Sequence, residues 1–393
     1  MDDITISSPI FLILLLSGPM LMRTTEAVRR YLFLIINIGL YAAYLNKAEE
    51  AAWILIFVLL PFIYIKLIHK RSIPVWPMIV IILSIFCYLD YFGKPSTIKL
   101  LGLSYMLFRQ IDILIQINSN LIPKIDIIDY LNYLFSFWTI MAGPIQRYNE
   151  YLESFYSKKI TSSNEEILQY LHRAANGMIK LLLIGAFLKN ASDEAFQYLC
   201  IVDNHSAKNL IVFFYCFPLY AYFNFSGYCD VVIAMAKIAG FDIPENFDKP
   251  YLARNLIEFW NRWHITLSLW IRDYVFQPLV KFLIKRNNSK HVSTIQYLSI
   301  FITFFIVGIW HGTTFNYVIF ALLQGFGMAA TMFYRDFLRK FLGKLRYTDY
   351  VNNRKIAFVE RIVCLHFMFY SVLYFGYDLN ELLSLQLKLV NLN

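Results

Sequence analysis

Residues 294–334 read TIQYLSIFITFFIVGIWHGTTFNYVIFALLQGFGMAATMFY, and this stretch contains no Asp, Glu, Lys or Arg. A helix needs about 20 apolar residues to cross the hydrocarbon core of a bilayer, which is about 30 Å thick. The stretch is long enough for two such helices and is divided near Gly312. It therefore predicts two membrane-spanning helices, Thr294–Trp310 and Thr313–Tyr334.

The composition of the whole chain agrees with this interpretation. Of its 393 residues, 58% are hydrophobic and 16% are charged, whereas charged residues make up about 25% of soluble proteins. The mean hydropathy is +0.51. We therefore expect an all-α polytopic integral membrane protein, with the lipid bilayer as its surroundings and no nucleic acid as a partner.

Further apolar runs predict roughly ten spans in a single membrane domain. The candidates are Ile10–Met22, Tyr31–Tyr44, Ala51–Leu67, Val75–Phe92, Ile98–Ile117, Tyr130–Ile145, His172–Leu188, Asn209–Phe225, Ser226–Gly240, Leu256–Leu283, Thr294–Trp310, Thr313–Tyr334 and Ile356–Phe375. Several are short or contain Gly and Pro. Such segments predict re-entrant backbone, which survives at membrane depth only where protein or a water-filled cavity surrounds it.

Basic residues mark the expected orientation, because cytoplasmic loops of membrane proteins carry an excess of Lys and Arg. One basic block lies between Lys281 and Lys290, and a second lies between Arg335 and Arg361. The net charge of +9 comes largely from such loops. The apolar pair 294–334 separates the two blocks, and two crossings return the chain to the same side. We expect both blocks to face the cytoplasm.

His311 is the only histidine in the uncharged stretch and lies between Gly308 and Gly312. Ionisable groups inside a membrane are costly and are functional candidates by default. Histidine also suits proton transfer near neutral pH. The two glycines leave room for a substrate or another backbone to approach. The structural alternative is a hydrogen-bonded histidine that stabilises a helix turn.

The segment 259–274 is the second candidate site. If it forms one helix, Trp260, Trp263, His264 and Leu267 share a face. Its three tryptophans and its basic residues predict a helix at the membrane interface or along a cavity. A plain interfacial belt explains the tryptophans equally well, but it does not explain His264.

Other polar residues have structural explanations. Arg109 and Asp112 are three residues apart, so on a helix they are expected to neutralise each other. The role of Asp230 is open on sequence grounds. The chain has no GxSxG, HExxH or P-loop motif, and its histidines and cysteines show no metal-binding spacing. We expect no bound metal and no bound cofactor.

Four ordered segments resemble a known family. They are residues 225–230 (FSGYCD), 244–251 (PENFDKPY), 260–274 and 308–312 (GIWHG), with weaker matches at 141–145 and 102–105. Together they look like the membrane-bound O-acyltransferase (MBOAT) family, in its bacterial cell-envelope branch. That branch includes enzymes that D-alanylate teichoic acids or acetylate alginate. The resemblance implies a bundle of about 10–12 membrane helices around a central tunnel. It places a catalytic core at 95–335, N-terminal spans at 1–94, and a basic loop with a C-terminal span at 336–393.

The resemblance also implies roles for residues. His311 stands at the position of the family's catalytic histidine, and His264 stands at the second polar site. His311 would act as general base, and His264 would orient substrate or stabilise an oxyanion. Around them we expect a substrate-binding set made up of Trp310, Asn261, Arg262, Ser268 and Asp273.

The expected reaction transfers a D-alanyl or acetyl group from a thioester donor, an acyl carrier protein or coenzyme A, to hydroxyls of an envelope polymer outside a cytoplasmic (inner) membrane. The apolar and basic segment 276–290 is expected to receive the carrier, through Val280, Lys281, Lys285 and Arg286. Positive-inside topology alone also explains its charge. The alternative function is a transporter or flippase of a lipid-linked envelope precursor.

Overall fold

The structure is a computed structural model that describes residues 24–45, 47–68, 73–92, 102–122, 124–156, 163–201, 206–287, 291–312 and 314–390. The expected first span, Ile10–Met22, lies outside these residues. Helices form nearly all of the regular structure in the described part, and the one β-bridge that it shows joins Phe247 to Trp263. The all-α prediction is confirmed.

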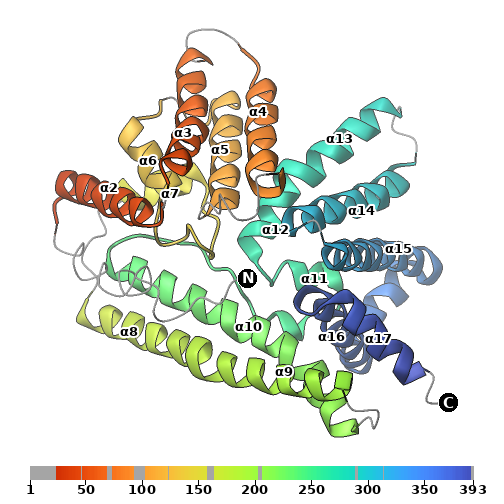
Figure 1. The fold of residues 1–393 in the computed structure, drawn as a ribbon. Helices are drawn as coiled ribbons and strands as arrows, with labels where there is room; N and C mark the ends of the chain where they lie inside the picture. The colour runs from red at the N-terminus through yellow and green to blue at the C-terminus, as the bar shows by residue number, and fades with distance from the viewer. Residues whose placement is uncertain are drawn as a thin grey trace. The chain divides into compact units, whose positions relative to one another are not determined.

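The chain forms two compact units, 1–178 with 227–245 and 179–226 with 246–393. The described elements of the first unit are α2 (Glu26–Ala43), α3 (Ala48–Ile68), α4 (Trp76–Cys87), η1 (Tyr88–Phe92), α5 (Leu103–Asn118), α6 (Ile127–Leu134), α7 (Tyr148–Tyr156), α8 (Asn164–Met178) and the C-terminal part of α10 (Ala207–Ile238) (Figure 1).

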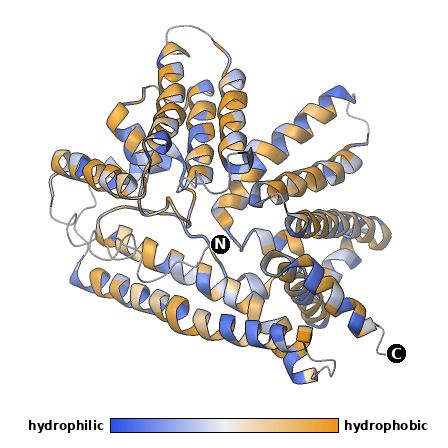
Figure 2. Cartoon of the chain, in the orientation of Figure 1, coloured by the Kyte–Doolittle hydropathy of each residue, from blue (hydrophilic) through white to orange (hydrophobic). Residues whose placement is uncertain are grey.

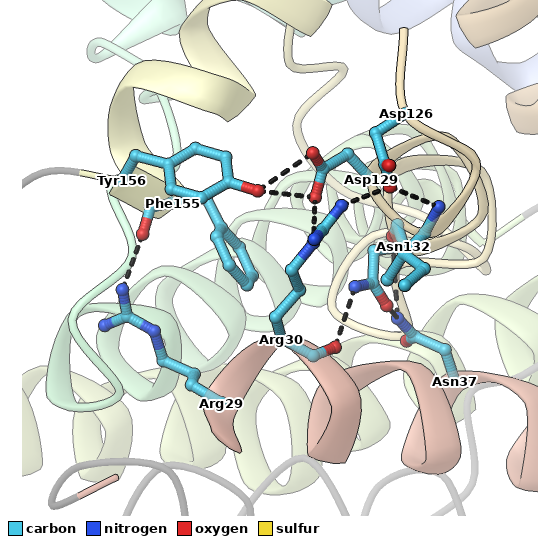
Figure 3. A network of polar contacts seen from close by, with 9 residues as sticks. Arg29, Arg30, Asn37, Asp126, Asp129, Asn132, Phe155 and Tyr156 are labelled. Atoms are coloured by element: carbon cyan, nitrogen blue, oxygen red, sulfur yellow. Dashed lines mark hydrogen bonds and ion pairs between the residues drawn. The ribbon is translucent and has the colours of Figure 1, made fainter. Parts of the chain in front are cut away.

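Two arginines of α2 form hydrogen bonds and ion pairs with other elements of the first unit. Arg30 of α2 forms ion pairs with Asp126 and Asp129, and the Tyr156 hydroxyl donates to Asp129 at 2.7 Å. Arg29 is buried and donates to the Phe155 carbonyl at 2.5 Å (Figure 3). Because a buried charge without a partner is costly, this network holds α2 against α6 and α7.

Arg109 and Asp112 do not form the expected pair. Arg109 donates to the Leu134 carbonyl at 2.6 Å and to the Thr139 hydroxyl. The Asp112 carboxylate instead forms an ion pair with Arg147 at 3.3 Å. It also accepts a hydrogen bond from the Tyr148 amide at 2.8 Å. The loop that follows α6 offers partners that spacing along α5 cannot reveal.

Asp230 is half of an ion pair in the same unit. The Arg173 Nε donates to Asp230 at 2.9 Å, and the two terminal nitrogens of Arg173 donate to Glu245 at 2.6 Å each. Bidentate contacts of this kind fix geometry as well as charge. The arrangement assigns Asp230 a structural role.

The second unit contains the remaining elements. They are η2 (Ile179–Gly185), α9 (Ala186–Ile201), the N-terminal part of α10, η3 (Pro250–Leu252), α11 (Leu256–Trp260), α12 (Ile265–Ile271), η4 (Arg272–Phe276), α13 (Gln277–Arg286), α14 (Val292–His311), α15 (Phe315–Asn352), α16 (Arg354–Gly376) and α17 (Leu379–Val390).

Six helical segments in the described part are long and apolar enough to cross a membrane. They are Ala48–Leu67, Asn164–Ile201, Ala207–Ile238, Val292–His311, Phe315–Asn352 and Arg354–Gly376. Figure 2 shows the apolar residues along these helices. The protein is therefore a multi-pass membrane protein, as predicted.

Four predicted spans differ from the structure. Residues 209–225 and 226–240, expected as two spans, lie in the single helix α10, which continues through Pro218. Tyr130–Ile145 is helical only as far as Leu134. Leu256–Leu283 is divided into short helices. Average hydropathy reports how apolar a segment is, and breaks like these depend on hydrogen bonds to distant residues.

α14 and α15 form an antiparallel hairpin, as the uncharged stretch predicts. The Tyr297 hydroxyl donates to Asp336 at 2.7 Å near one end. Near the other end, a Cβ on Gly308 would lie 2.3 Å from the Ala321 Cβ. The two basic blocks therefore flank the same end of the hairpin. His311 lies at the opposite end, about 30 Å away along the 20 residues of α14.

Candidate active site

The segment 259–274 is broken at its centre and does not form the single helix that was expected. α11 ends at Trp260, and α12 begins at Ile265. His264 lies in the break with φ 45° and ψ 53°, the left-handed conformation that non-glycine residues rarely adopt. The expected shared face of Trp260, Trp263, His264 and Leu267 is therefore absent.

A distant segment explains the break. Residues 246–248 run alongside 262–265, where the Asp248 amide donates to the Arg262 carbonyl at 2.9 Å. The Ile265 amide donates to the Asn246 carbonyl at 3.0 Å. These bonds satisfy backbone groups that a continuous helix would use itself. The two motifs 244–251 and 260–274 therefore form one structural element.

His264 is buried, with 8% of its surface exposed. Its Nδ1 lies 3.2 Å from the Asn246 Oδ1, and its ring packs edge-on against Phe225 with centroids 4.8 Å apart. Burial, with a smaller contribution from His311, lowers the pKa of His264 to about 3. The imidazole is therefore neutral near pH 7.

His311 is the last residue of α14 and is half-buried. Its ring lies among three aromatic rings, with centroid distances of 4.3 Å to Trp310, 4.9 Å to Phe375 and 6.1 Å to Tyr317. Within the described residues, its ring nitrogens make no hydrogen bond. The alternative of a histidine hydrogen-bonded to a helix turn has no support in these contacts.

The two flanking glycines allow protein, not substrate, to approach. A Cβ on Gly308 would meet the Ala321 Cβ at 2.3 Å and the Tyr317 carbonyl oxygen at 2.8 Å. Gly312 has φ +157°, and a Cβ there would lie 2.6 Å from the Tyr317 ring. The two glycines therefore allow α14 and α15 to pack closely at the end of the hairpin where His311 lies.

The two histidines lie in the same compact unit. After burial, His311 makes the next largest contribution to lowering the pKa of His264. They come from elements more than 40 positions apart in the sequence. The unit thus brings together two imidazoles with different surroundings, one held by a hydrogen bond and one by aromatic rings.

The expected substrate-binding residues have mixed surroundings. Trp310 packs against His311, as noted above. Arg262 forms an ion pair with Glu258 at 2.7 Å, and Asp273 forms one with Arg272 at 2.9 Å. The Ser268 hydroxyl donates to the Trp263 carbonyl at 3.3 Å. Asn261 is exposed at the end of α11. Asn261 and Arg262 thus lie in the break, and the roles of all five residues in binding stay predictions.

Sequence reasoning missed two buried amides. Asn246 contacts His264, and Gln324 lies in the uncharged stretch. The Trp260 Nε1 donates to the Gln324 Oε1 at 3.1 Å, and the Gln324 Nε2 donates to the Ser371 hydroxyl at 2.7 Å. A lone glutamine in an apolar span was a usable signal, because an unpaired amide there is costly. Trp260 is therefore connected by hydrogen bonds to α15 directly and to α16 through Gln324.

α13 carries the expected carrier-docking residues. Val280 is half-buried, and Lys281, Lys285 and Arg286 are exposed. Phe282 on the same helix is also exposed. Lys285 and Arg286 lie in the last turn, where cations interact favourably with the helix dipole. An exposed apolar and basic surface exists at α13, and its partner stays a prediction.

Comparison with known proteins places these features in a family. The sequence model described as "MBOAT, membrane-bound O-acyltransferase family" matches residues 114–377, more than half of the chain. The matched range includes α14, the break at His264 and the segment around Asn246.

Relatives are similar over a large part of the chain. A teichoic acid D-alanyltransferase of Bacillus subtilis is 28% identical over 72% of this chain and 69% of its own length. One of Streptococcus thermophilus is 29% identical over 60% of this chain and 57% of its own length. A probable alginate O-acetylase AlgI of Pseudomonas aeruginosa is 29% identical over 58% of this chain and 42% of its own length. The chain thus spans from under half to about two thirds of these relatives.

Proposed function

The chain belongs to the membrane-bound O-acyltransferase family, and from this premise we propose that it transfers an acyl group from a thioester to hydroxyls of a cell-envelope polymer. The observation that carries the proposal is the pair His264 and His311. His264 is buried and neutral near pH 7, and His311 lies in the same compact unit, at the end of α14.

In the proposed reaction, His311 is the general base. It takes the proton of the acceptor hydroxyl as the hydroxyl oxygen attacks the thioester carbonyl. A C–O bond forms, the C–S bond breaks, and the leaving thiolate takes the proton back from the imidazolium. Proton transfer by a positioned side chain contributes about 10²–10⁴-fold to rate. His264 orients the acceptor or stabilises the developing negative charge.

The acyl group is D-alanyl or acetyl, as the names of the relatives suggest. We favour D-alanyl transfer to a teichoic acid for two sequence reasons. The segment after Tyr274 lacks the glycines typical of alginate-acetylating members, and the stretch 281–291 is basic. This choice concerns the substrate and leaves the reaction type unchanged.

The hairpin of α14 and α15 supports a sidedness for the reaction. The basic blocks lie at one end and His311 lies at the other. With the basic end in the cytoplasm of a cytoplasmic membrane, the donor arrives from that side. The acceptor polymer then approaches the end that carries His311. The re-entrant central segments would enclose the tunnel in which the two meet.

We propose that α13 docks the donor when the donor is an acyl carrier protein. Its exposed Phe282 and half-buried Val280 offer an apolar contact, and Lys281, Lys285 and Arg286 offer positive charge. Electrostatic complementarity of this kind speeds association with an acidic partner.

Mass spectrometry of envelope polymers tests the function. Cells would express the wild type, His311→Ala or, as a control, His366→Ala at equal membrane levels. His366, on α16, forms a hydrogen bond with the Tyr215 hydroxyl of α10 at 2.8 Å. We expect an added mass with the wild type and the control and none with His311→Ala. Its size separates acetyl from D-alanyl.

If no polymer gained mass in any strain while the protein was present and donors were supplied, the transporter alternative would replace this proposal. Full activity of His311→Ala would refute its role as base.

A further inference from the structure

Asn246 is the residue that holds His264, and nothing in the sequence motifs assigns it a role. We propose that Asn246 is a positioning residue that fixes His264 as the Nδ1–H tautomer, so that the unprotonated Nε2 is the nitrogen presented to the acceptor hydroxyl. The inference rests on the proposed function and specifies how the second histidine works in it.

The identity of the Asn246 side-chain atom follows from its partners. The backbone N–H of Thr266 lies 3.2 Å from that atom, and the Thr266 hydroxyl lies 2.9 Å from it. A backbone N–H can only donate a hydrogen bond. The atom must therefore be the amide oxygen.

The tautomer of His264 follows in turn. The same Oδ1 lies 3.2 Å from the His264 Nδ1, and an oxygen that accepts a bond there requires a proton on Nδ1. In a neutral imidazole, only one nitrogen carries a proton. Nε2 is then unprotonated, and within the described residues it makes no hydrogen bond.

Asn246 can do this because its own position is fixed. The residue is 1% exposed, and its backbone carbonyl accepts from the Ile265 amide at 3.0 Å. Phe225 packs against the ring of His264. His264 has a left-handed backbone conformation, and its Nδ1 lies within hydrogen-bonding distance of the Asn246 Oδ1. Substitution of the Asn246 side chain leaves the backbone bond to Ile265 in place.

The tautomer decides between the two proposed roles of His264. An unprotonated Nε2 can accept a hydrogen bond from a substrate hydroxyl, but it has no proton to donate to an oxyanion. The lowered pKa of His264 keeps it in this neutral form near pH 7. His264 therefore orients the acceptor. An amide that fixes a histidine in this way matches the logic of Cys–His–Asn enzymes.

Three variants of the full-length protein test the inference in vesicles. Asn246→Ala removes the acceptor of the Nδ1 proton, and we expect kcat to fall about 10²–10⁴-fold with little change in KM. Asn255→Ala is the matched control. Asn255 caps α11 by accepting from the Glu258 amide at 3.0 Å and does not contact His264. We expect its loss to lower the melting temperature and to leave kcat unchanged.

Asn246→Asp keeps the inference testable if the alanine variant does not fold. A carboxylate still accepts the Nδ1 proton, so activity at alkaline pH is retained. Its negative charge stabilises the imidazolium and raises the pKa of His264. As the pH falls, Nε2 is therefore protonated at a higher pH than in the wild type. The acid limb of the plot of kcat against pH moves to higher pH by about one unit or more. A purely structural role for Asn246 would not move this limb.

The tautomer is also measurable without activity, from ¹⁵N NMR of histidine-labelled protein with His264→Gln to assign the signal. We expect an unprotonated Nε2 in the wild type and a mixture of tautomers in Asn246→Ala. A protonated Nε2 in the wild type would overturn the inference. So would an Asn246→Ala enzyme within about threefold of wild-type kcat, or an Asn246→Asp profile that coincides with the wild type. If the wild type transfers no acyl group, the proposed function fails, and the NMR result still decides the tautomer.

Discussion

His264 and His311 show how the same side chain is given two environments. Asn246 bonds one nitrogen of His264 inside a buried break between helices. His311 ends a helix and is packed by aromatic rings, with no hydrogen bond to its nitrogens among the described residues. Histidine was recognisable in sequence as a candidate for proton transfer. Which nitrogen faces a substrate depends on Asn246, 18 positions away from His264.

The lowered pKa of His264 makes stability depend on pH. An unfolded histidine has a pKa of about 6.5, so above that pH both states are neutral and His264 has no effect. Below it, the unfolded state binds a proton that the folded state refuses until about pH 3. We expect His264 to cost about 1.4 kcal/mol of stability at pH 5.5. The check is the fall in melting temperature from pH 7.5 to 5.5, which should be larger for the wild type than for His264→Gln. Equal falls would contradict the buried, neutral imidazole.

Gly308 is required by packing. In Gly308→Ala, the new Cβ meets the backbone and Cβ of α15 below contact distance, and overpacking of this kind costs about 1–3 kcal/mol. We expect a lower melting temperature and reduced transfer, because His311 follows three residues later. Gly39→Ala, in α2, is the control, since nothing lies within 4 Å of its new Cβ. That change should leave stability equal or slightly higher. Equal changes in melting temperature for the two variants would show that α15 shifts to accommodate the new Cβ at position 308 without an energetic cost.

At the scale of elements, apolar periodicity predicts helices well and their interruptions poorly. α14, α15 and α16 appear where the sequence places them. α10 is one helix where two spans, 209–225 and 226–240, were expected, and 256–283 is divided where one span was expected. A helix continues or breaks according to where its backbone groups find partners. For 262–265, those partners are in 246–248.

α13 is the element whose proposed role is most directly testable. Lys285→Glu with Arg286→Glu reverses charge on an exposed helix end. We expect KM for an acyl carrier donor to rise several-fold, increasingly so at low salt, because charge steers association. The measurement is initial rate against carrier concentration at two ionic strengths. Lys344→Glu with Arg346→Glu, also exposed, makes the same charge change elsewhere and should leave KM unchanged. Matching effects of both pairs would indicate a general electrostatic contribution and no docking site at α13.

At the scale of the molecule, the hairpin fixes which ends of the chain share a side. Both basic blocks flank the end where Tyr297 bonds to Asp336. In a cysteine-free background, Lys285→Cys and Lys344→Cys should therefore be labelled from the same, cytoplasmic side by a membrane-impermeant maleimide. Labelling of intact cells should fail for both, and labelling of inverted vesicles should succeed for both. Reaction of the two sites from opposite sides would refute the hairpin as a membrane-crossing pair.

The sequence by itself determined that this protein lies in a membrane, that it is helical, and that His311 and His264 are its candidate residues. Hydropathy and the absence of charge over a span are local properties, and a bilayer imposes them directly on the sequence. Only the tertiary structure decided the partner of each polar side chain. It shows an ion pair between Asp112 and Arg147 and a hydrogen bond between Trp260 and Gln324. It also shows that α15 packs closely against Gly308 and that Asn246 forms a hydrogen bond with His264. Such contacts depend on where distant segments meet, and satisfying buried polar groups in low dielectric is what fixes those meetings.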